Sequence, residues 1–313
     1  MLTAEEIVRY TVGLAAMTGV AVLAPWAGMR VLLPSLQAGP AVRNYRGAEV
    51  SLGLGVVWVF WGAALLSLEA LVSATATTRL FGGPAWFEPS LIAPLVLGAF
   101  LFGLIDDTFG TPGHRGFRGH LAALAERRLT TGALKLFGIG ALALAGAAAP
   151  ALGDQEATVA SAGRYIAAAL VIALAANTVN LFDLRPARAL KVYCVLVVAG
   201  IAGGVAAGVA GGAPASVATS EGLVLLVAAA GPVIAVWGPD AREQAMLGDA
   251  GANAFGMFAG LVLVWSLPDG ATIAAAALLL ALNLLSERVS FSAVIEDVPW
   301  LAALDRWGRP PQR

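Results

Sequence analysis

Long apolar runs separated by short polar segments dominate the chain. A helix needs roughly 20 apolar residues to cross the hydrocarbon core of a bilayer. Windows of about that length fall near residues 7–33, 50–74, 89–105, 131–150, 160–181, 190–211, 220–237, 248–266 and 270–286. These runs do not alternate with period two, so the pattern predicts an all-α fold, a polytopic integral membrane helical bundle of about nine transmembrane helices. Residues 1–286 would form this bundle, and residues 287–313 would form a tail.

The basic residues predict the orientation of the bundle. With the N-terminus outside, the loops assigned to the cytoplasm and the C-terminal tail hold Arg43, Arg46, Arg115, Arg118, Arg127, Arg128, Arg185, Arg188, Lys191, Arg242, Arg288, Arg306, Arg309 and Arg313. Only Arg9, Arg79 and Arg164 fall clearly outside. This distribution satisfies the positive-inside rule and places the C-terminus in the cytoplasm. The apolar and charged residues of the tail suggest an amphipathic helix on the membrane surface, with a disordered terminus as the alternative.

Composition supports a membrane protein. The 313 residues are 59% hydrophobic and 12% charged, with a net charge of -1 and a mean hydropathy of +0.81. A soluble domain is far less apolar. Cys194 is the single cysteine and lies in an apolar run, which excludes an intrachain disulfide and argues against a thiolate metal site.

Two adjacent carboxylates, Asp106 and Asp107, close the third apolar window. Like charges at this spacing disfavour joint ionisation unless a cation lies between them. They also oppose the dipole at a helix C-terminus. We therefore expect a cation or a basic group beside the pair, the alternative being a solvated helix end.

A second polar cluster ends the fifth window, where Asn177, Asn180 and Asp183 recur at about helical spacing. Steps of three residues place side chains on one helix face. Buried amides need hydrogen-bond partners, so these side chains should face the bundle interior or a polar ligand. Hydrogen bonding between helices is the alternative.

A third cluster, Gly248-Asp249-Ala250-Gly251, opens the eighth window. Asp249 could be an ordinary N-cap, but the flanking glycines also allow the backbone to approach a phosphate closely. The predicted topology places all three clusters at cytoplasmic helix ends.

Basic residues near the first cluster suit a phosphate ligand. The loop 108–128 carries both histidines, His114 and His120, and several arginines. Such a loop can bind phosphate, although a solvated loop that obeys the positive-inside rule is the simpler interpretation. Lys135 lies about one turn inside the fourth window and needs an anionic partner there.

Taken in order, Gly103-x-x-Asp106-Asp107, Asn177-x-x-Asn180-Leu181-x-Asp183 and Gly248-Asp249-x-Gly251 resemble the polyprenyl-phosphate N-acetylhexosamine-1-phosphate transferases. This superfamily includes the phospho-N-acetylmuramoyl-pentapeptide transferase of peptidoglycan synthesis. The resemblance runs from about Asn44 to the start of the ninth window. It implies transfer of a sugar-1-phosphate from a UDP-sugar to undecaprenyl phosphate, with release of UMP, for cell-envelope glycan synthesis.

The resemblance also implies roles for individual residues. Asp249 matches the principal Mg²⁺ ligand, and Asp106, Asp107 and Asp183 match catalytic acids. Substrate binding would fall to Lys135, Asn177, Asn180, Arg185, His114 and His120. The expected partners are a polyprenyl phosphate, a nucleotide sugar and the membrane, with no nucleic acid, and a homodimer is left open. We expect a multi-pass protein of the inner (cytoplasmic) membrane with its active site facing the cytoplasm.

The chain departs from the family pattern in three places. Leu184-Arg185-Pro186-Ala187 replaces a glycine, an acid and a glycine, so one supporting carboxylate is missing. The segment 287–313 has no histidine, where the family has a histidine-rich loop, and no tenth span is predicted after it. A non-catalytic scaffold or regulator that binds lipid phosphates is therefore the alternative. A transporter is disfavoured because the acids cluster at one surface, with only Glu69 well inside a predicted span.

Overall fold

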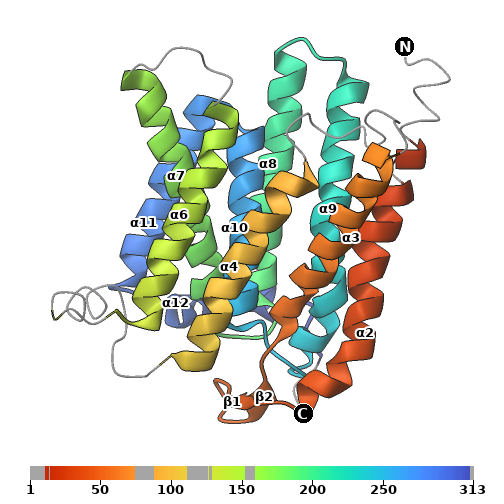
Figure 1. The fold of residues 1–313 in the computed structure, drawn as a ribbon. Helices are drawn as coiled ribbons and strands as arrows, with labels where there is room; N and C mark the ends of the chain where they lie inside the picture. Colours follow the sequence, from red (N-terminus) through yellow and green to blue (C-terminus); the bar gives the residue numbers. More distant parts are fainter. Residues whose placement is uncertain are drawn as a thin grey trace.

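The computed structural model describes residues 11–13, 15–74, 88–110, 126, 129–151 and 159–310. This part of the chain forms a bundle of long helices with one small hairpin (Figure 1). The elements in chain order are the π-helical turn η1 (Gly19–Leu23), α2 (Ala24–Gln37), β1 (Ala41–Arg43), β2 (Glu49–Ser51), the 3-10 turn η2 (Leu54–Val56), α3 (Val57–Ala74), α4 (Pro89–Phe109), α6 (Thr131–Ala151), α7 (Val159–Phe182), α8 (Arg188–Ala210), α9 (Ala215–Ala241), α10 (Gly248–Ser266), α11 (Asp269–Ser286), α12 (Phe291–Asp297) and α13 (Pro299–Arg306).

Eight helices in the described ranges are long and apolar enough to cross a membrane. The first spans Thr11–Gln37 and includes η1 and α2, and the others lie in α3, α4, α6, α7, α8, α9 and α11. The predicted all-α class and the membrane character are thus confirmed at this coarse level. The predicted window 248–266 corresponds to α10, which is not among the eight and which carries Asp249, Asn253 and several glycines.

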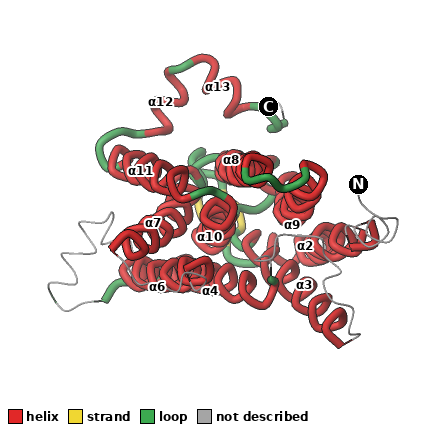
Figure 2. Tube along the Cα trace, turned by 90° about the horizontal axis from the view of Figure 1, so that it is seen from above, coloured by secondary structure: helices red, strands yellow, loops and turns green. Residues whose placement is uncertain are grey.

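Helix α10 occupies the centre of the bundle, with the other long helices arranged around it (Figure 2). Each of its residues from Ala250 to Trp265 is buried, and it packs mainly on α7, α4 and α8. A Cβ on Gly256 would lie 2.4 Å from the Cα atom of Ala176 in α7, so glycine is required for this approach. Because α10 faces protein on all sides, it can carry polar residues that a lipid-facing helix could not.

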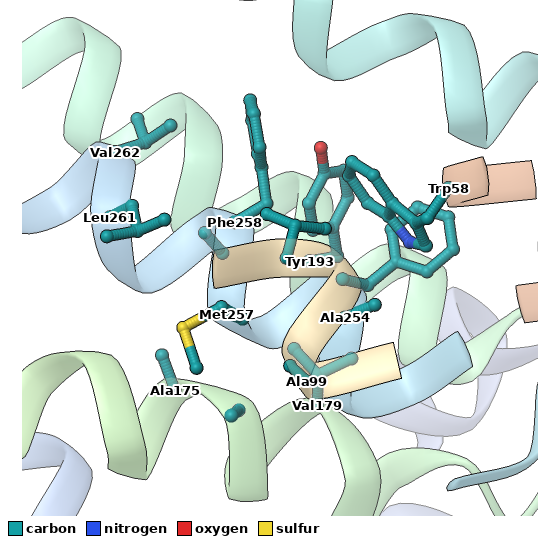
Figure 3. Packing of buried hydrophobic residues seen from close by; sticks show 14 of the residues in the cluster. Trp58, Ala99, Ala175, Val179, Tyr193, Ala254, Met257, Phe258, Leu261 and Val262 are labelled. Atoms are coloured by element: carbon teal, nitrogen blue, oxygen red, sulfur yellow. The ribbon is translucent and has the colours of Figure 1, made fainter. Parts of the chain in front are cut away.

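An aromatic cluster joins α3, α8 and α10 (Figure 3). The Trp58 ring lies 4.9 Å from that of Phe255 and 5.4 Å from that of Phe258, and the Tyr193 ring lies 4.8 Å from that of Phe255. The hydroxyl of Tyr193 donates to the carbonyl oxygen of Ala229 in α9 at 2.9 Å. Edge-to-face aromatic pairs contribute about 0.5–1.5 kcal/mol beyond their buried area. This cluster holds four helices in fixed relative positions.

The hairpin β1–β2 was not predicted from the apolar windows. It is antiparallel, with Ala41 opposite Ser51 and Arg43 opposite Glu49. The backbone N–H of Met246 donates to the carbonyl of Ser51 at 2.8 Å. The hairpin therefore holds the segment that leads into α10.

Candidate functional site

Lys135 joins two of the predicted acids. Its ammonium lies 2.6 Å from Oδ2 of Asp106 and 2.6 Å from Oδ2 of Asp249. The three side chains come from α6, α4 and α10 and keep 16%, 15% and 29% of their surface exposed. The predicted anionic partner of Lys135 is thus a pair of carboxylates from two other helices.

Asp107 has a different position from its neighbour Asp106. Its Oδ1 accepts from the backbone N–H of Asp249, and its Oδ2 accepts from that of Ala250, both at 2.9 Å. Asp107 therefore caps the N-terminus of α10 from another helix, where free N–H groups and the helix dipole favour a negative charge. The two adjacent acids therefore have different roles: Asp106 forms an ion pair with Lys135, and Asp107 hydrogen-bonds the first backbone N–H groups of α10.

Close packing of α4 against α10 brings these acids together. A Cβ on Gly103 would lie 2.4 Å from the carbonyl oxygen of Asp249 and 2.5 Å from the Cα atom of Ala250. Gly248 has a φ of 66°, in the left-handed region that favours glycine. The glycines that the sequence motifs contain are thus needed for the backbone geometry of the site.

Asp183 follows the last residue of α7 and lies close to other carboxylates. Burial raises its pKa well above the ordinary value, and the negative charges of Asp240, Asp249 and Asp107 raise it further. The backbone N–H of Gly248 acts in the opposite direction, because it hydrogen-bonds the charged form. Asp183 therefore belongs electrostatically to the same site as Asp249.

Asp240 near the end of α9 was missed by the sequence analysis. It is 3% exposed and accepts a 2.7 Å hydrogen bond from the backbone N–H of Ala187, which has a φ of 56°. Its sequence signal was an acid just inside the polar segment that follows an apolar window. It thereby fixes the backbone of the segment that follows Asp183.

These residues form the acid cluster, which we define as Asp106, Asp107, Asp183, Asp240 and Asp249. Among the ion pairs of the described residues, those that reach this cluster come from Lys135. The Lys135 ammonium pairs with two of these acids, and burial holds the pKa of Asp183 well above its ordinary value, so the five acids do not all carry a charge together. A further cation would favour their ionised forms.

No group of three histidine, cysteine or acidic side chains is arranged to hold a metal ion in the described part of the chain. Mg²⁺ does not require such a group, because it commonly binds one or two carboxylates together with waters and substrate phosphates. The oxygens of Asp106 and Asp249 converge on one small cation, the ammonium of Lys135. These two oxygens are ligands of the type that Mg²⁺ takes, and the ion could use them only in place of this ammonium.

The two predicted asparagines have different surroundings. Asn177 is exposed and donates to the side-chain oxygen of Asn283 in α11, and Asn283 donates to Thr178 Oγ1 at 2.9 Å. The hydrogen bond of Asn177 therefore joins two helices, α7 and α11. Asn180 is half-buried, and its backbone carbonyl oxygen accepts a hydrogen bond from the backbone N–H of Asp183 at 3.1 Å. Asn283, which the sequence analysis missed, completes the contact between α7 and α11.

Arg185 is held by residues that sequence reasoning did not connect to it. It forms an ion pair with Glu296 of α12, and its guanidinium lies 4.7 Å from the centre of the Tyr45 ring. The tail and the hairpin segment thus meet beside Asp183. His114 and His120 lie outside the described residues.

The acid cluster and Lys135 are the features of the chain that bear on its function. Comparison with family models, with curated proteins and with solved structures found no match to this chain.

Proposed function

We propose that the protein transfers a sugar-1-phosphate from a UDP-sugar to a polyprenyl phosphate such as undecaprenyl phosphate, with release of UMP, for cell-envelope glycan synthesis such as that of peptidoglycan. The reaction takes place at the cytoplasmic face of the inner membrane. The observation that carries the proposal is the convergence of Asp106 and Asp249 on the Lys135 ammonium, at 2.6 Å each, beside the other acids of the cluster. This arrangement suits a divalent cation and phosphate groups.

Asp249 and Asp106 would hold Mg²⁺, with Asp183 as a further acid beside them. Bound there, the ion supplies positive charge to the phosphate oxygens and stabilises the negative charge that develops on the leaving UMP. With Mg²⁺ held by these carboxylates, the Lys135 ammonium would be available to pair with a phosphate oxygen. Asp107 keeps the start of α10 in place throughout, since both of its oxygens bind backbone N–H groups.

In the chemical step, an oxygen of the lipid phosphate forms a bond to the phosphorus that carries the sugar. The bond from that phosphorus to the oxygen of UMP breaks, and the electron pair leaves with UMP. A phosphate monoester has a second pKa near 6 and is largely dianionic at neutral pH. The acids of the site therefore need not act as strong bases, and their main roles are to hold the ion and to position the phosphates.

A second candidate function is a scaffold or regulator that binds lipid phosphates without catalysis. The observation in its favour is that Lys135 already forms ion pairs with both Asp106 and Asp249. A site whose acids already have a cationic partner within the chain can remain stable without a metal ion. The missing acid after Asp183 and the missing histidines of the tail point the same way.

The experiment that separates the two uses purified protein in detergent with undecaprenyl phosphate, Mg²⁺ and a panel of UDP-sugars. UMP release is followed for the unaltered chain, for Asp249→Ala and for Asp269→Ala. Asp269 is a matched control because it is an exposed aspartate at the start of α11 and pairs with Arg164, away from the acid cluster. We expect release with the unaltered chain and with Asp269→Ala, but not with Asp249→Ala. Lipid-phosphate binding without UMP release from any donor would support the scaffold.

A further inference from the structure

A buried ion cluster fixes the rotation of α13, the last helix. Asp305 accepts two hydrogen bonds from Arg188 of α8, at 2.8 and 2.9 Å, and one from Arg309 at 2.7 Å. The side chains of Asp305, Arg188 and Arg309 are 9%, 4% and 6% exposed. Such a bidentate, buried pair permits little rotation of the helix that carries it.

Further contacts hold the same segment against α7 and α8. The ammonium of Lys191 donates to the carbonyl oxygens of Leu304 and Asp305, at 3.0 and 2.5 Å. The ring of Phe291 in α12 stacks on that of Phe182, with 5.3 Å between centroids. The segment is therefore attached to the bundle both through α12 and through α13.

The opposite side of α13 presents large apolar side chains. Trp300, Leu304 and Trp307 are 68%, 55% and 66% exposed. Trp300 and Leu304 are four residues apart and therefore lie on one face of the helix. Trp307 follows the last residue of α13, and one side of its ring makes an edge-to-face contact with Trp237 of α9, with 6.0 Å between centroids. Large apolar side chains exposed together in this way are typical of a surface that contacts a membrane or another protein.

The position of α13 indicates what covers this face. Helices α12 and α13 form an arc outside the ring of long helices, beyond α8 and α11 (Figure 2). Both α8 and α11 are long and apolar enough to cross a membrane. The arc lies toward the end of the bundle that carries the hairpin (Figure 1). A segment beside the spanning helices and near their ends meets the boundary between lipid and water.

The charges of α13 agree with a lipid surface. Of its two charged side chains, Asp305 is buried in the ion cluster and Arg306 is exposed. The free charge next to the apolar face is thus positive, as in interfacial helices that bind anionic headgroups. Tryptophan is also enriched at this depth of a membrane.

We propose that α13 is an interfacial anchor, in which Trp300, Leu304 and Trp307 enter the leaflet at this end of the bundle and Arg306 contacts anionic lipid headgroups. The Arg188–Asp305 pair thereby determines which face of the amphipathic tail expected from the sequence is exposed. The inference is independent of any catalytic activity, because it uses no residue of the acid cluster.

The test uses the full chain, with Cys194→Ser as background, in nanodiscs that contain anionic phosphatidylglycerol. Nitroxide labels are placed singly at Leu304→Cys, which leaves both tryptophans intact, and at Asp297→Cys, an exposed control position in α12. Molecular oxygen concentrates in lipid and a nickel chelate stays in water. We expect the ratio of oxygen to nickel accessibility to be severalfold higher at position 304 than at position 297.

Two further measurements test the tryptophans and the lipid charge separately. Replacing both tryptophans by serine should reduce the ratio at position 304 severalfold, and nanodiscs of zwitterionic lipid should reduce it to a smaller extent. Equal, water-like accessibility at the two positions would overturn the anchor, and an unchanged ratio in zwitterionic lipid would overturn the role of Arg306. Dipolar broadening between labels at position 304 would instead identify a second copy of the chain as the cover and would also refute the proposal.

Discussion

Replacement of Lys135 by methionine tests the electrostatics of the acid cluster directly. Methionine keeps much of the length and the apolar stem of lysine but removes the charge that lies 2.6 Å from both Asp106 and Asp249. Removing one partner of a fully buried ion pair costs about 3–5 kcal/mol. The three side chains here keep 16%, 15% and 29% of their surface exposed, so water screens part of the repulsion. We therefore expect a loss of about 2–3 kcal/mol, or roughly 3–5 °C in melting temperature for a chain of this length.

The assay is thermal unfolding of the purified protein in detergent across a series of Mg²⁺ concentrations. A cation that replaces the ammonium should restore the variant, because a ligand at about 100 times its Kd stabilises the folded state by about 2.7 kcal/mol. Arg46→Met is the matched control, since it breaks the exposed pair of Arg46 with Glu243 and should have a much smaller effect. An unchanged melting temperature in Lys135→Met would refute the argument that the ammonium neutralises the two acids. A lowered melting temperature that Mg²⁺ does not restore would refute the exchange of ammonium for cation.

Three further predictions concern the packing of the site and of the tail. Gly103→Ala should cost about 1–3 kcal/mol in a thermal melt, because its Cβ would lie 2.4 Å from the carbonyl oxygen of Asp249. Gly140→Ala, whose Cβ meets nothing within 4 Å, should be neutral or stabilising, and equal effects of the two changes would contradict the close approach. Asn283→Ala should cost about 1–2 kcal/mol in the same melt through its bonds to α7, and no loss would show that these bonds are unimportant. Burial works to raise the pKa of Asp305, but Arg188, Arg309 and Lys191 outweigh it and hold this pKa below its ordinary value. Its contribution is thus complete above about pH 4 and is lost as pH falls through the lowered pKa. The protection factors of the α13 amides, which correct for the pH dependence of intrinsic exchange, should therefore fall in acid, and in Asp305→Asn they should be low at every pH.

Much of the architecture could be predicted from local sequence. A bilayer requires long apolar helices with internally satisfied backbones, and this requirement is visible in any window of adequate length. The predicted windows accordingly overlap the long helices, including α10, although α10 is central and carries Asp249 and Asn253. The hairpin β1–β2 could not be predicted in this way, because strands of three residues are too short to show a periodicity. Its contact with Met246 joins segments that are far apart in the chain.

The candidate site could be predicted only in outline. Helix-end acids and a lysine within an apolar run stand out because charge is costly near lipid, so Asp106, Asp249 and Lys135 could be selected from sequence. Their partners could not, since contacts between α4, α6 and α10 depend on how three helices pack. Asp240 and Asn283 were missed for the same reason: each is a single polar residue whose importance comes from a neighbour far away in the chain.

Long apolar helices with polar residues near their ends follow from local sequence alone, because the cost of burying polar groups in lipid acts on each segment separately. The pairing of Asp106 with Lys135, the capping of α10 by Asp107 and the bond between Asn177 and Asn283 follow only from how the helices pack, as does the exposed face of α13 that Arg188 fixes. These choices depend on distances of a few ångströms between helices. Glycines at closely packed positions, such as Gly103 and Gly256, and the aromatic cluster around Phe255 set these distances. Their effect on packing appears only when the helices are brought together.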